Sequence, residues 1–427
     1  MMQTSRNWIA SVGARRVAHC AALGMLVSAM LLPEAAPARD FVHGVDFVRP
    51  IQFSVADQDA KLAELQSAGV RVIRFGMYAQ DEDKNVDFIK RAHAHQISTV
   101  IILHGLYTPG APERPYRPKE FPGMWPGPPL SALDPERSAQ YFQRLMNTLE
   151  AAGVVLAGLE LENEINMAGN DPDFRLPGEG RVLGLADLSN DPEGQQVAKG
   201  YLQYLKVLEV LKQVRDHSKL NRQTPLLPTS LVDIEQEEPW PTPKPYDGVS
   251  VAATMAFFRA HGLDRLVDAY NLHTYPRADH PGDQASAIHR MRRLRALLEP
   301  LCVPNGKPCW ITEWGFSYAG RACTTAEDTA HARLVQEMMG DFAQLAKEGR
   351  LAGLIYYSWT GDPQFDVTRC GGVSEAGKRA LAPFLRSFAR SDGADAIVKD
   401  LFLGHARPAA SRRAKGGQRW TSIASPQ

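Results

Sequence analysis

Two glutamates, Glu164 and Glu313, each stand where an apolar run of the chain ends. Glu164 closes LELENE, which follows the apolar stretch GVVLAG, and Glu313 lies within WITEWGF. A strand that ends in carboxylates indicates that its end faces a cleft and not a core. Two carboxylates on either side of a sugar are the usual means of breaking a glycosidic bond, because one donates a proton while the other attacks or activates water. We therefore expect this pair to be catalytic.

Other polar or aromatic residues also close apolar runs. They are Arg74, His104, Asn163, His273, Tyr275 and Trp359. In a barrel of parallel strands, functional groups stand at the carboxyl ends of the strands. Six of eight expected strand ends therefore carry a side chain suited to a site.

The elements that would position these residues alternate strictly. Eight apolar runs expected to be strands are separated by amphipathic stretches: FVHGVDF, VRVIRFGMY, STVIILHGLY, VLAGLELEN, TPLLPTSLV, LVDAYNLHTYP, PCWITEWGF and LAGLIYYSW. One helix should begin at Asp134-Pro135, a capping residue followed by proline at the first helical position. Such alternation fits an open doubly wound sheet or a closed barrel. Eight units in 427 residues favour a single-domain (β/α)8 TIM barrel with long βα loops on the catalytic face.

The two ends of the chain are expected to lie outside this barrel, which we place at residues 39–403. Residues 1–38 have the pattern of a signal peptide, with Arg15-Arg16 before the run AALGMLVSAMLL and a small-x-small motif ending at Ala38. The run is too short for a stable membrane anchor. We expect a secreted or periplasmic protein cleaved after Ala38, with a twin-arginine signal as the alternative. Residues 404–427 form a basic tail, predicted to be disordered.

Export leaves four cysteines, and an even number in an exported chain suggests two disulfides. Three pairings are possible. Cys302 and Cys309 flank the turn VPNGKP and could close a short loop, so we favour that pair together with Cys323–Cys370.

Several other classes of function have little support. The formal net charge is zero, so nothing points to nucleic acid or to an anionic membrane. No Gly-x-Gly-x-x-Gly follows the first strand, which removes the main sign of a dinucleotide site. His93 and His95 are two apart on an expected helix and face different sides, so we expect no metal and no cofactor. The segment 315–319, GFSYA, lacks the second glycine of a lipase-type elbow.

Taken together, these residues resemble clan A of the glycoside hydrolases, retaining (β/α)8 enzymes, and are most similar to family 5. In that clan an Asn-Glu pair ends the fourth strand, as Asn163 and Glu164 do here. The resemblance implies that Glu164 is the acid/base, that Asn163 binds the sugar 2-hydroxyl, and that Glu313 is the nucleophile.

The remaining strand-end residues also take their expected roles from the resemblance. Arg74 and Tyr275 would steady the nucleophile, and His273 precedes that tyrosine in a His-x-Tyr motif. His104 would lie in the substrate cleft. Trp359 would form the floor of the subsite for the sugar being cleaved.

The expected activity is hydrolysis of β-linked glycans or glycosides by double displacement, and the expected partner is a carbohydrate. A retaining enzyme needs its two carboxyl groups about 5–5.5 Å apart. A transglycosylase on the same site and a non-catalytic sugar-binding barrel remain alternatives. The sequence identifies neither the sugar nor the oligomeric state.

Two further carboxylates and several loop aromatics complete the expectations. Glu160, one layer below Glu164, should be a buried structural carboxylate paired with an arginine, because an isolated buried charge is costly. Glu162 could bind a substrate hydroxyl. Trp125, in a proline-rich loop after the third strand, could be a sugar platform or could pack that loop onto the barrel. Trp240 offers a similar ring in a later loop.

Overall fold

Parallel strands form the centre of the structure. The computed structural model describes residues 41–234, 246–276, 284–303, 306–317, 324–369 and 371–382. The main sheet contains β1 (Val42–Asp46), β2 (Val72–Met77), β3 (Ser98–Leu103), β4 (Gly158–Leu161), β6 (Leu226–Leu227), β7 (Leu231–Val232), β9 (Tyr270–Thr274), β10 (Cys309–Trp314) and β11 (Leu351–Tyr356). Their order is β6–β4–β3–β2–β1–β11–β10–β9–β7. All eight predicted strands are therefore present, the fifth as two pieces.

The interrupted fifth strand closes the sheet into a barrel. Its first piece, β6, pairs with β4, and its second piece, β7, pairs with β9. Between them, Pro228 has no N–H to contribute to a ladder. Side chains replace the missing ladder partners: Thr229 N donates to the Tyr204 hydroxyl, and Ser230 N donates to Glu160 Oε1. The sequence predicts one continuous strand here, and the proline with its two neighbours explains the break.

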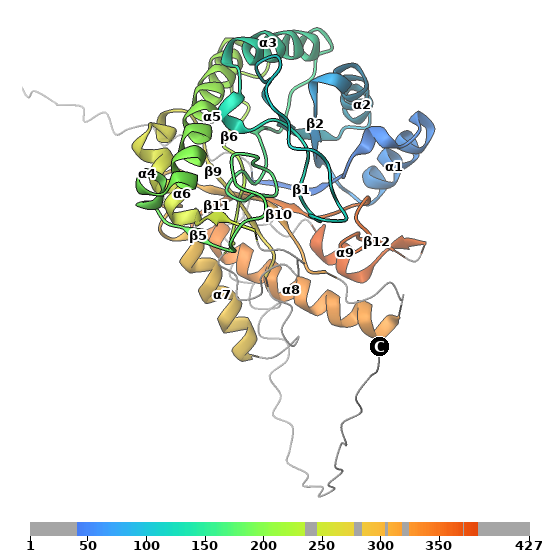
Figure 1. Cartoon of the computed structure of the whole chain (residues 1–427). Coiled ribbons are helices and arrows are strands. Elements are labelled where there is room, and N and C mark those ends of the chain that lie inside the picture. Colours follow the sequence, from blue (N-terminus) through green and yellow to red (C-terminus); the bar gives the residue numbers. More distant parts are fainter. Residues whose placement is uncertain are drawn as a thin grey trace, which may run out of the picture. The chain divides into compact units, whose positions relative to one another are not determined.

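Helices follow the strands along the chain and lie outside them (Figure 1). They are α1 (Val55–Ser67), α2 (Glu82–Ala94), α3 (Pro135–Ala151), α4 (Asp187–Asn190), α5 (Pro192–His217), α6 (Val251–Ala260), α7 (Gln284–Leu298), α8 (Thr325–Lys347) and α9 (Glu375–Ala380). Two short pairs decorate the loops: β5 (Val182–Leu183) with β8 (Gly248–Val249), and β12 (Thr368–Arg369) with β13 (Gly372–Val373). The (β/α)8 barrel prediction is confirmed.

Local sequence sets the helix starts. Asp134 caps α3 by accepting a hydrogen bond from Arg137 N at 3.0 Å, and Pro135 occupies the first helical position, as the sequence predicts. Ser54 caps α1 in the same way through Asp57 N. These caps fix where each βα loop ends, and therefore how much chain is left to build the catalytic face.

The register of the strands sets which side chains meet inside the barrel. Asp46 of β1 lies beside Arg74 of β2, and Gly76 lies beside Ile102, which in turn lies beside Glu160 of β4. Alternate residues of a strand point to the same side. Asp46, Arg74 and Glu160 are buried, so β1, β2 and β4 all direct charge into the barrel interior.

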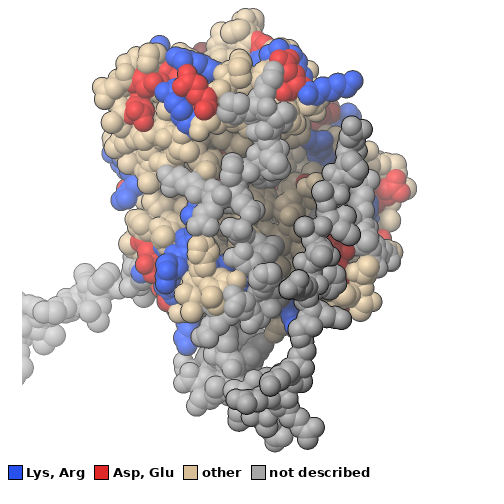
Figure 2. Space-filling view, turned by 60° about the horizontal axis from the view of Figure 1, so that its bottom comes forward, with Lys and Arg blue, Asp and Glu red and all other residues tan. Residues whose placement is uncertain are grey.

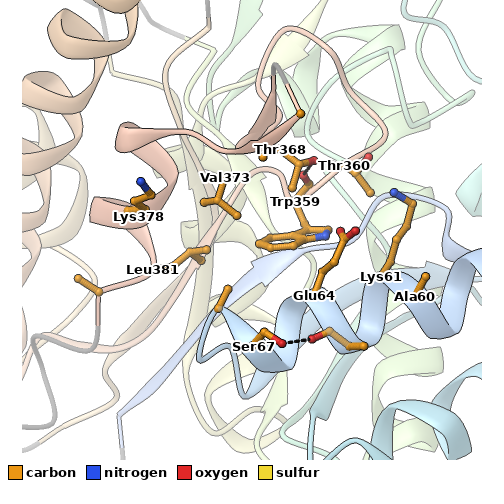
Figure 3. Close-up of a pocket in the computed structure, with 15 residues that line it drawn as sticks. Ala60, Lys61, Glu64, Ser67, Trp359, Thr360, Thr368, Val373, Lys378 and Leu381 are labelled. Carbon is orange, nitrogen blue, oxygen red and sulfur yellow. Dashed lines mark hydrogen bonds between the residues drawn. The ribbon is translucent and has the colours of Figure 1, made fainter.

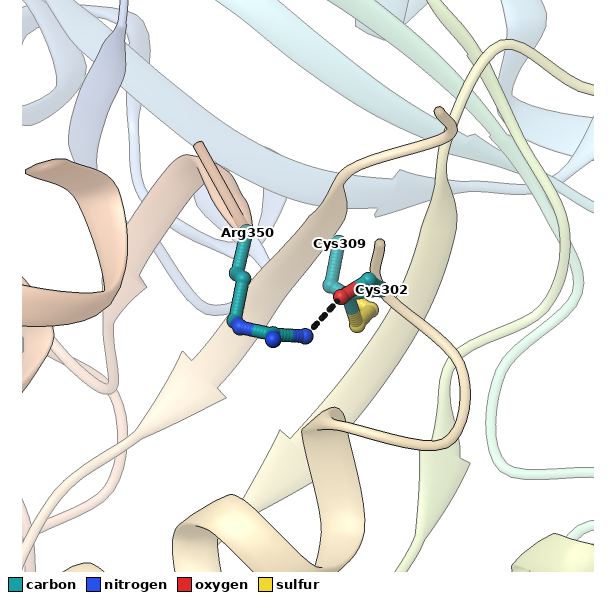
Figure 4. The surroundings of a disulfide bond; sticks show 3 residues. All are labelled: Cys302, Cys309 and Arg350. Carbon is teal, nitrogen blue, oxygen red and sulfur yellow. Dashed lines mark hydrogen bonds between the residues drawn. A yellow bond between two sulfur atoms is a disulfide. The ribbon is translucent and has the colours of Figure 1, made fainter. Parts of the chain in front are cut away.

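A disulfide joins Cys302 to Cys309 with a Cα–Cα distance of 5.4 Å (Figure 4). Arg350 Nη1 donates a hydrogen bond to the Cys302 carbonyl at 2.7 Å. Cys309 is the first residue of β10, so the bond lies at the end of the barrel opposite to Glu313. The predicted Cys302–Cys309 pair is confirmed. The predicted Cys323–Cys370 pair lies outside the described residues.

The described surface mixes charges of both signs. In Figure 2 basic and acidic side chains are interspersed over the visible face. Among the described residues no helix combines the length and the apolar character that crossing a membrane requires. The predicted signal peptide and basic tail, residues 1–38 and 404–427, both fall outside the described part of the chain.

Candidate active site

Arg74 is the centre of the site. Its side chain is fully buried, and its guanidinium donates to three carboxylates. Nε and Nη2 bind the two oxygens of Glu160 at 2.8 and 3.1 Å, while Nη1 is shared between Asp46, at 3.1 Å, and Glu313, at 2.8 Å. The expected pairing of Glu160 with an arginine is confirmed. Charge-assisted bonds of this kind hold the guanidinium in one orientation.

Glu313 receives a donor on each oxygen. Arg74 donates to Oε1, and the Tyr275 hydroxyl donates to Oε2 at 2.5 Å. Burial raises the pKa of Tyr275 well above its usual value, and the negative charge of Glu313 adds to the rise, so the hydroxyl keeps its proton to donate. The Glu313 side chain is still 12% exposed. Two donors thus orient the carboxylate, which stays reachable, and a carboxylate nucleophile needs both.

Glu164 faces Glu313 across a narrow gap. One oxygen of each carboxylate and one ring nitrogen of His273 all lie within 4.8 Å of one another. His273 Nδ1 is 2.8 Å from Glu164 Oε1, and Asn170 donates to Oε2 at 3.2 Å. The backbone of Glu164 is left-handed, with φ of 49°, a strained conformation that clusters at functional sites when it occurs outside glycine.

Two more predicted residues join this cluster. Asn163 Oδ1 accepts hydrogen bonds from Arg74 Nη2 and from the Ser230 hydroxyl, both at 3.1 Å. The fully buried His273 ring has its Nε2 3.1 Å from Thr312 Oγ1. The structure therefore gathers Arg74, Asn163, Glu164, His273, Tyr275 and Glu313 into one connected network.

His104 lies in a neighbouring part of the same face. Its Nδ1 is 2.7 Å from Glu162 Oε2, and Gly105 N donates to Glu162 Oε1. Tyr78 stacks on the His104 ring with centroids 4.2 Å apart and an interplanar angle of 3°. Glu162 is only 5% exposed, so its carboxylate orients His104 instead of offering itself to a substrate.

Trp125 is 45% exposed, but a cation already lies over its ring. The Arg49 guanidinium carbon is 4.9 Å from the ring centroid. In the same loop Phe121 is buried, whereas Tyr116 is exposed. Trp240 lies outside the described residues. Trp125 therefore reaches the catalytic face, and it does so as a support for Arg49.

Trp359 does not occupy the place that the sequence assigns to it. It is fully buried, and Figure 3 shows its ring against α1, beside Glu64, in a pocket of about 1150 Å³ on the flank of the barrel. The aromatic residue that approaches the cluster is Tyr357. The ring centroids of Tyr357 and Tyr275 are 6.0 Å apart. Burial raises the pKa of Tyr357, and the negative charge of Glu313 adds to the rise. The expectation of a subsite floor at Trp359 is therefore wrong.

Sequence reasoning missed three members of the site: Asp46, Asn170 and Tyr357. Asp46 ends the first strand and could have been found by the same strand-end rule as the others. Tyr357 directly follows the last strand, two residues before the tryptophan that drew attention. Asn170 lies in the loop after β4, where only the folded loop brings it to Glu164.

The cluster of Glu164, His273 and Glu313 is also the one group in the described chain that could offer three ligand atoms to a metal ion. The Glu313 oxygens of this cluster already accept hydrogen bonds. Arg74 and Tyr275 donate to the two Glu313 oxygens, and the Arg74 cation lies 2.8 Å from one of them. A metal ion bound to either Glu313 oxygen would compete with the donor already there and would be repelled by the buried guanidinium, so these residues fit a metal poorly.

No model of a known protein family matches the sequence, and neither does any curated protein. Solved structures resemble the fold. GH5_18 from Streptomyces cattleya, solved in complex with GlcNAc, is 14% identical, covers 83% of this chain and 82% of its own, and superposes with a TM-score of 0.52. An endo-1,4-beta-mannanase from Rhizomucor miehei is 12% identical, covers 82% of this chain and 96% of its own, and has a TM-score of 0.49. At 14% identity, the likeness to GH5_18 shows that the two chains share the barrel fold.

Proposed function

We propose that the protein is a retaining β-glycosidase, with Glu313 as nucleophile and Glu164 as acid/base. The close approach of the two carboxylates carries the proposal: one oxygen of each lies within 4.8 Å of the other, and both contact the same nitrogen of His273, at 2.8 and 3.5 Å. Such an approach favours the retaining spacing of carboxyl groups, about 5–5.5 Å, over the wider inverting one. The different partners of the two glutamates support the division of roles. Glu313 accepts from Arg74 and Tyr275, whereas Glu164 contacts His273 and Asn170.

The reaction would proceed in two displacements. Glu313 attacks the anomeric carbon while Glu164 gives its proton to the departing glycosidic oxygen, and the bond between that carbon and oxygen breaks. A glycosyl ester of Glu313 results. Glu164, now a carboxylate, then takes a proton from a water whose oxygen attacks the same carbon and releases Glu313. Two inversions leave the anomeric configuration unchanged.

The test compares Glu313→Ala and Glu164→Ala with wild type on a panel of aryl β-glycosides. We expect each substitution to lower kcat by about 10⁴-fold, because both displacement steps depend on these groups. Glu209→Gln, on the exposed side of α5, is a matched control that should retain full activity.

Azide separates the two roles. Azide should restore turnover of both variants, with an α-glycosyl azide from Glu313→Ala and a β-glycosyl azide from Glu164→Ala, because each variant lacks a different step. A first-formed product of inverted configuration, observed by NMR, would contradict the mechanism. Sugar binding by wild type without turnover of any glycoside would favour a non-catalytic sugar-binding barrel, and transfer to sugar acceptors in preference to water would favour a transglycosylase.

We extend the proposal to export. A disulfide in the described part of the chain, Cys302–Cys309, is more common in oxidising compartments than in the cytosol. The intact mass of the protein recovered from a secreting host should correspond to a chain that begins at residue 39. A mass that includes residues 1–38 would contradict cleavage after Ala38.

A further inference from the structure

One tier of side chains on the catalytic face is formed by the residues that follow three neighbouring strands. Gly76, Ile102 and Glu160 lie side by side on β2, β3 and β4. Tyr78, His104 and Glu162 are the first residues after β2, β3 and β4. They are joined by the Tyr78–His104 stack and the His104–Glu162 hydrogen bond.

The tier presents hydrogen-bonding atoms to whatever lies above it. Glu162 uses one oxygen for His104 Nδ1 and the other for Gly105 N, so His104 keeps its second ring nitrogen, Nε2, for another partner. A Cβ placed on Gly76 would come within 3.8 Å of that nitrogen, so the missing side chain leaves space there. The Tyr78 side chain is 51% exposed, with one face covered by His104.

Arg49 follows β1 on the same rim as this tier, and no described carboxylate pairs with it. Its side chain is exposed. The Trp125 ring supports the guanidinium from one side. Arg49 and Tyr78 follow the neighbouring strands β1 and β2, three and four residues beyond the register partners Asp46 and Arg74, so both lie on the same part of the rim. The positive charge of Arg49 opposes the rise of the Tyr78 pKa that burial causes.

The backbone of Arg49 is left-handed, with φ of 48°, which is uncommon outside glycine, asparagine and aspartate. A long, flexible cation is normally solvated and free to move. Here the turn before η1 (Pro50–Gln52) and the cation–π contact with Trp125 restrict it. A restrained arginine without a carboxylate partner is suited to bind an incoming anion, because its planar fork matches a carboxylate or sulfate.

We propose that Arg49, Trp125, Tyr78 and His104 form a subsite for a negatively charged group on the sugar unit that lies toward β1–β4. The substrate would be an acidic glycan that carries a uronate or a sulfate. Arg49 binds the anionic group, while Tyr78 and His104 Nε2 bind hydroxyls of the same unit. The inference rests on the proposed glycosidase function and adds a substrate class to it.

The test uses the full chain and three oligosaccharides with the same backbone and linkage: one neutral, one with a uronate in one unit, and one with a sulfate in one unit. We expect wild type to prefer one of the acidic substrates by about tenfold or more in kcat/KM at low salt, the size of one charge-assisted hydrogen bond. The preference should shrink as salt is added. Which acidic substrate is preferred identifies the anion.

Arg49→Gln should lower this preference about tenfold, mainly through KM. Trp125→Leu should lower it partly, because Arg49 loses its support. Arg117→Gln is the matched control, an arginine that also lies over an aromatic ring, Phe121, and that should leave the preference unchanged. Thermal unfolding of each variant checks that it folds.

Equal wild-type kcat/KM for the three substrates would overturn the inference and leave the glycosidase proposal intact. An equal loss on neutral and acidic substrates in Arg49→Gln would overturn it as well. If wild type cleaves none of them, calorimetric binding decides the inference alone. Tighter binding of an acidic than of the neutral oligosaccharide, lost in Arg49→Gln, supports the subsite, and equal or absent binding overturns it.

Discussion

At the scale of single residues, Arg74 holds more carboxylates than one guanidinium can neutralise. Asp46, Glu160 and Glu313 all accept hydrogen bonds from it. Burial raises the pKa of Asp46 well above its ordinary value of 3.8, and the charges of Glu313 and Glu160 add to the rise against the opposing effect of Arg74. Asp46 therefore gives up its proton less readily than a free carboxyl group does.

Asp46→Asn should therefore change how stability depends on pH. Folded Asp46 binds its proton more tightly than the unfolded chain does, so unfolding above pH 3.8 releases a proton, and rising pH favours the unfolded state. Asparagine removes this effect. We expect the variant to gain stability relative to wild type as pH rises from about 4 toward the raised pKa, measured by urea unfolding. Parallel pH curves for the two proteins would refute this.

Particular residues show how far sequence reasoning reaches in the site. Strand ends locate Asn163, Glu164, His273, Tyr275 and Glu313, because parallel strands of a barrel bring their carboxyl ends to one rim. Arg74 lies inside β2, three residues before its end, and not at the strand end that the sequence predicts. The prediction that Trp359 forms the subsite floor is wrong for a local reason. Trp359 is two residues beyond Tyr357 and would share its side in a continuing strand, but β11 ends at Tyr356 and the chain turns. Asn170 depends on a loop path that no periodicity encodes.

At the scale of elements, the same rule explains why the strands are predictable and the break in the fifth is not. Hydrophobic runs report burial, and both β6 and β7 are buried. Continuity depends instead on which side chains replace ladder partners, and those come from α5 and β4. These hydrogen-bonding side chains are distant from the fifth strand in sequence, and they reach it only when the barrel closes.

Asn166 is the side chain that ties the loop after β4 to this broken region. It is fully buried, donates to the Val232 and Val249 carbonyls, and accepts from Val232 N. We expect Asn166→Ala to lower the free energy of unfolding by about 3 kcal/mol, because it leaves buried backbone groups without partners. It should also reduce kcat, because Glu164 lies two residues away.

Urea unfolding and steady-state kinetics check both effects of Asn166→Ala. Asn190→Ala, at the exposed end of α4, is the control and should change stability by less than about 0.5 kcal/mol. If the two variants are equally stable, the bonds of Asn166 do not hold the loop as described.

At the scale of the whole barrel, the two ends of the strands serve different purposes. Glu164 and Glu313 gather at the carboxyl ends, while the Cys302–Cys309 disulfide lies at the amino end of β10. Barrels of this type separate activity from stability in this way. The separation makes the effect of the disulfide testable without disturbing the chemistry.

The double variant Cys302→Ala, Cys309→Ala should lose about 2 kcal/mol of stability, the chain-entropy value for so short a loop. We expect its kcat and KM to stay within about twofold of wild type at a temperature where it is folded, because the bond is remote from the cluster. Urea unfolding and aryl glycoside kinetics measure the two quantities. A large fall in kcat at full folding would show that the two ends are coupled.

The guanidinium of residue 74 supports the barrel wall and orients the carboxylate of Glu313, the proposed nucleophile, through the same few bonds. Single replacements at positions 74 or 160 would thus disturb folding and the proposed turnover together, which leaves an evolving lineage little freedom there. Libraries that aim to change the choice of glycan should keep these two codons fixed and diversify the loops that follow β1, β2 and β3.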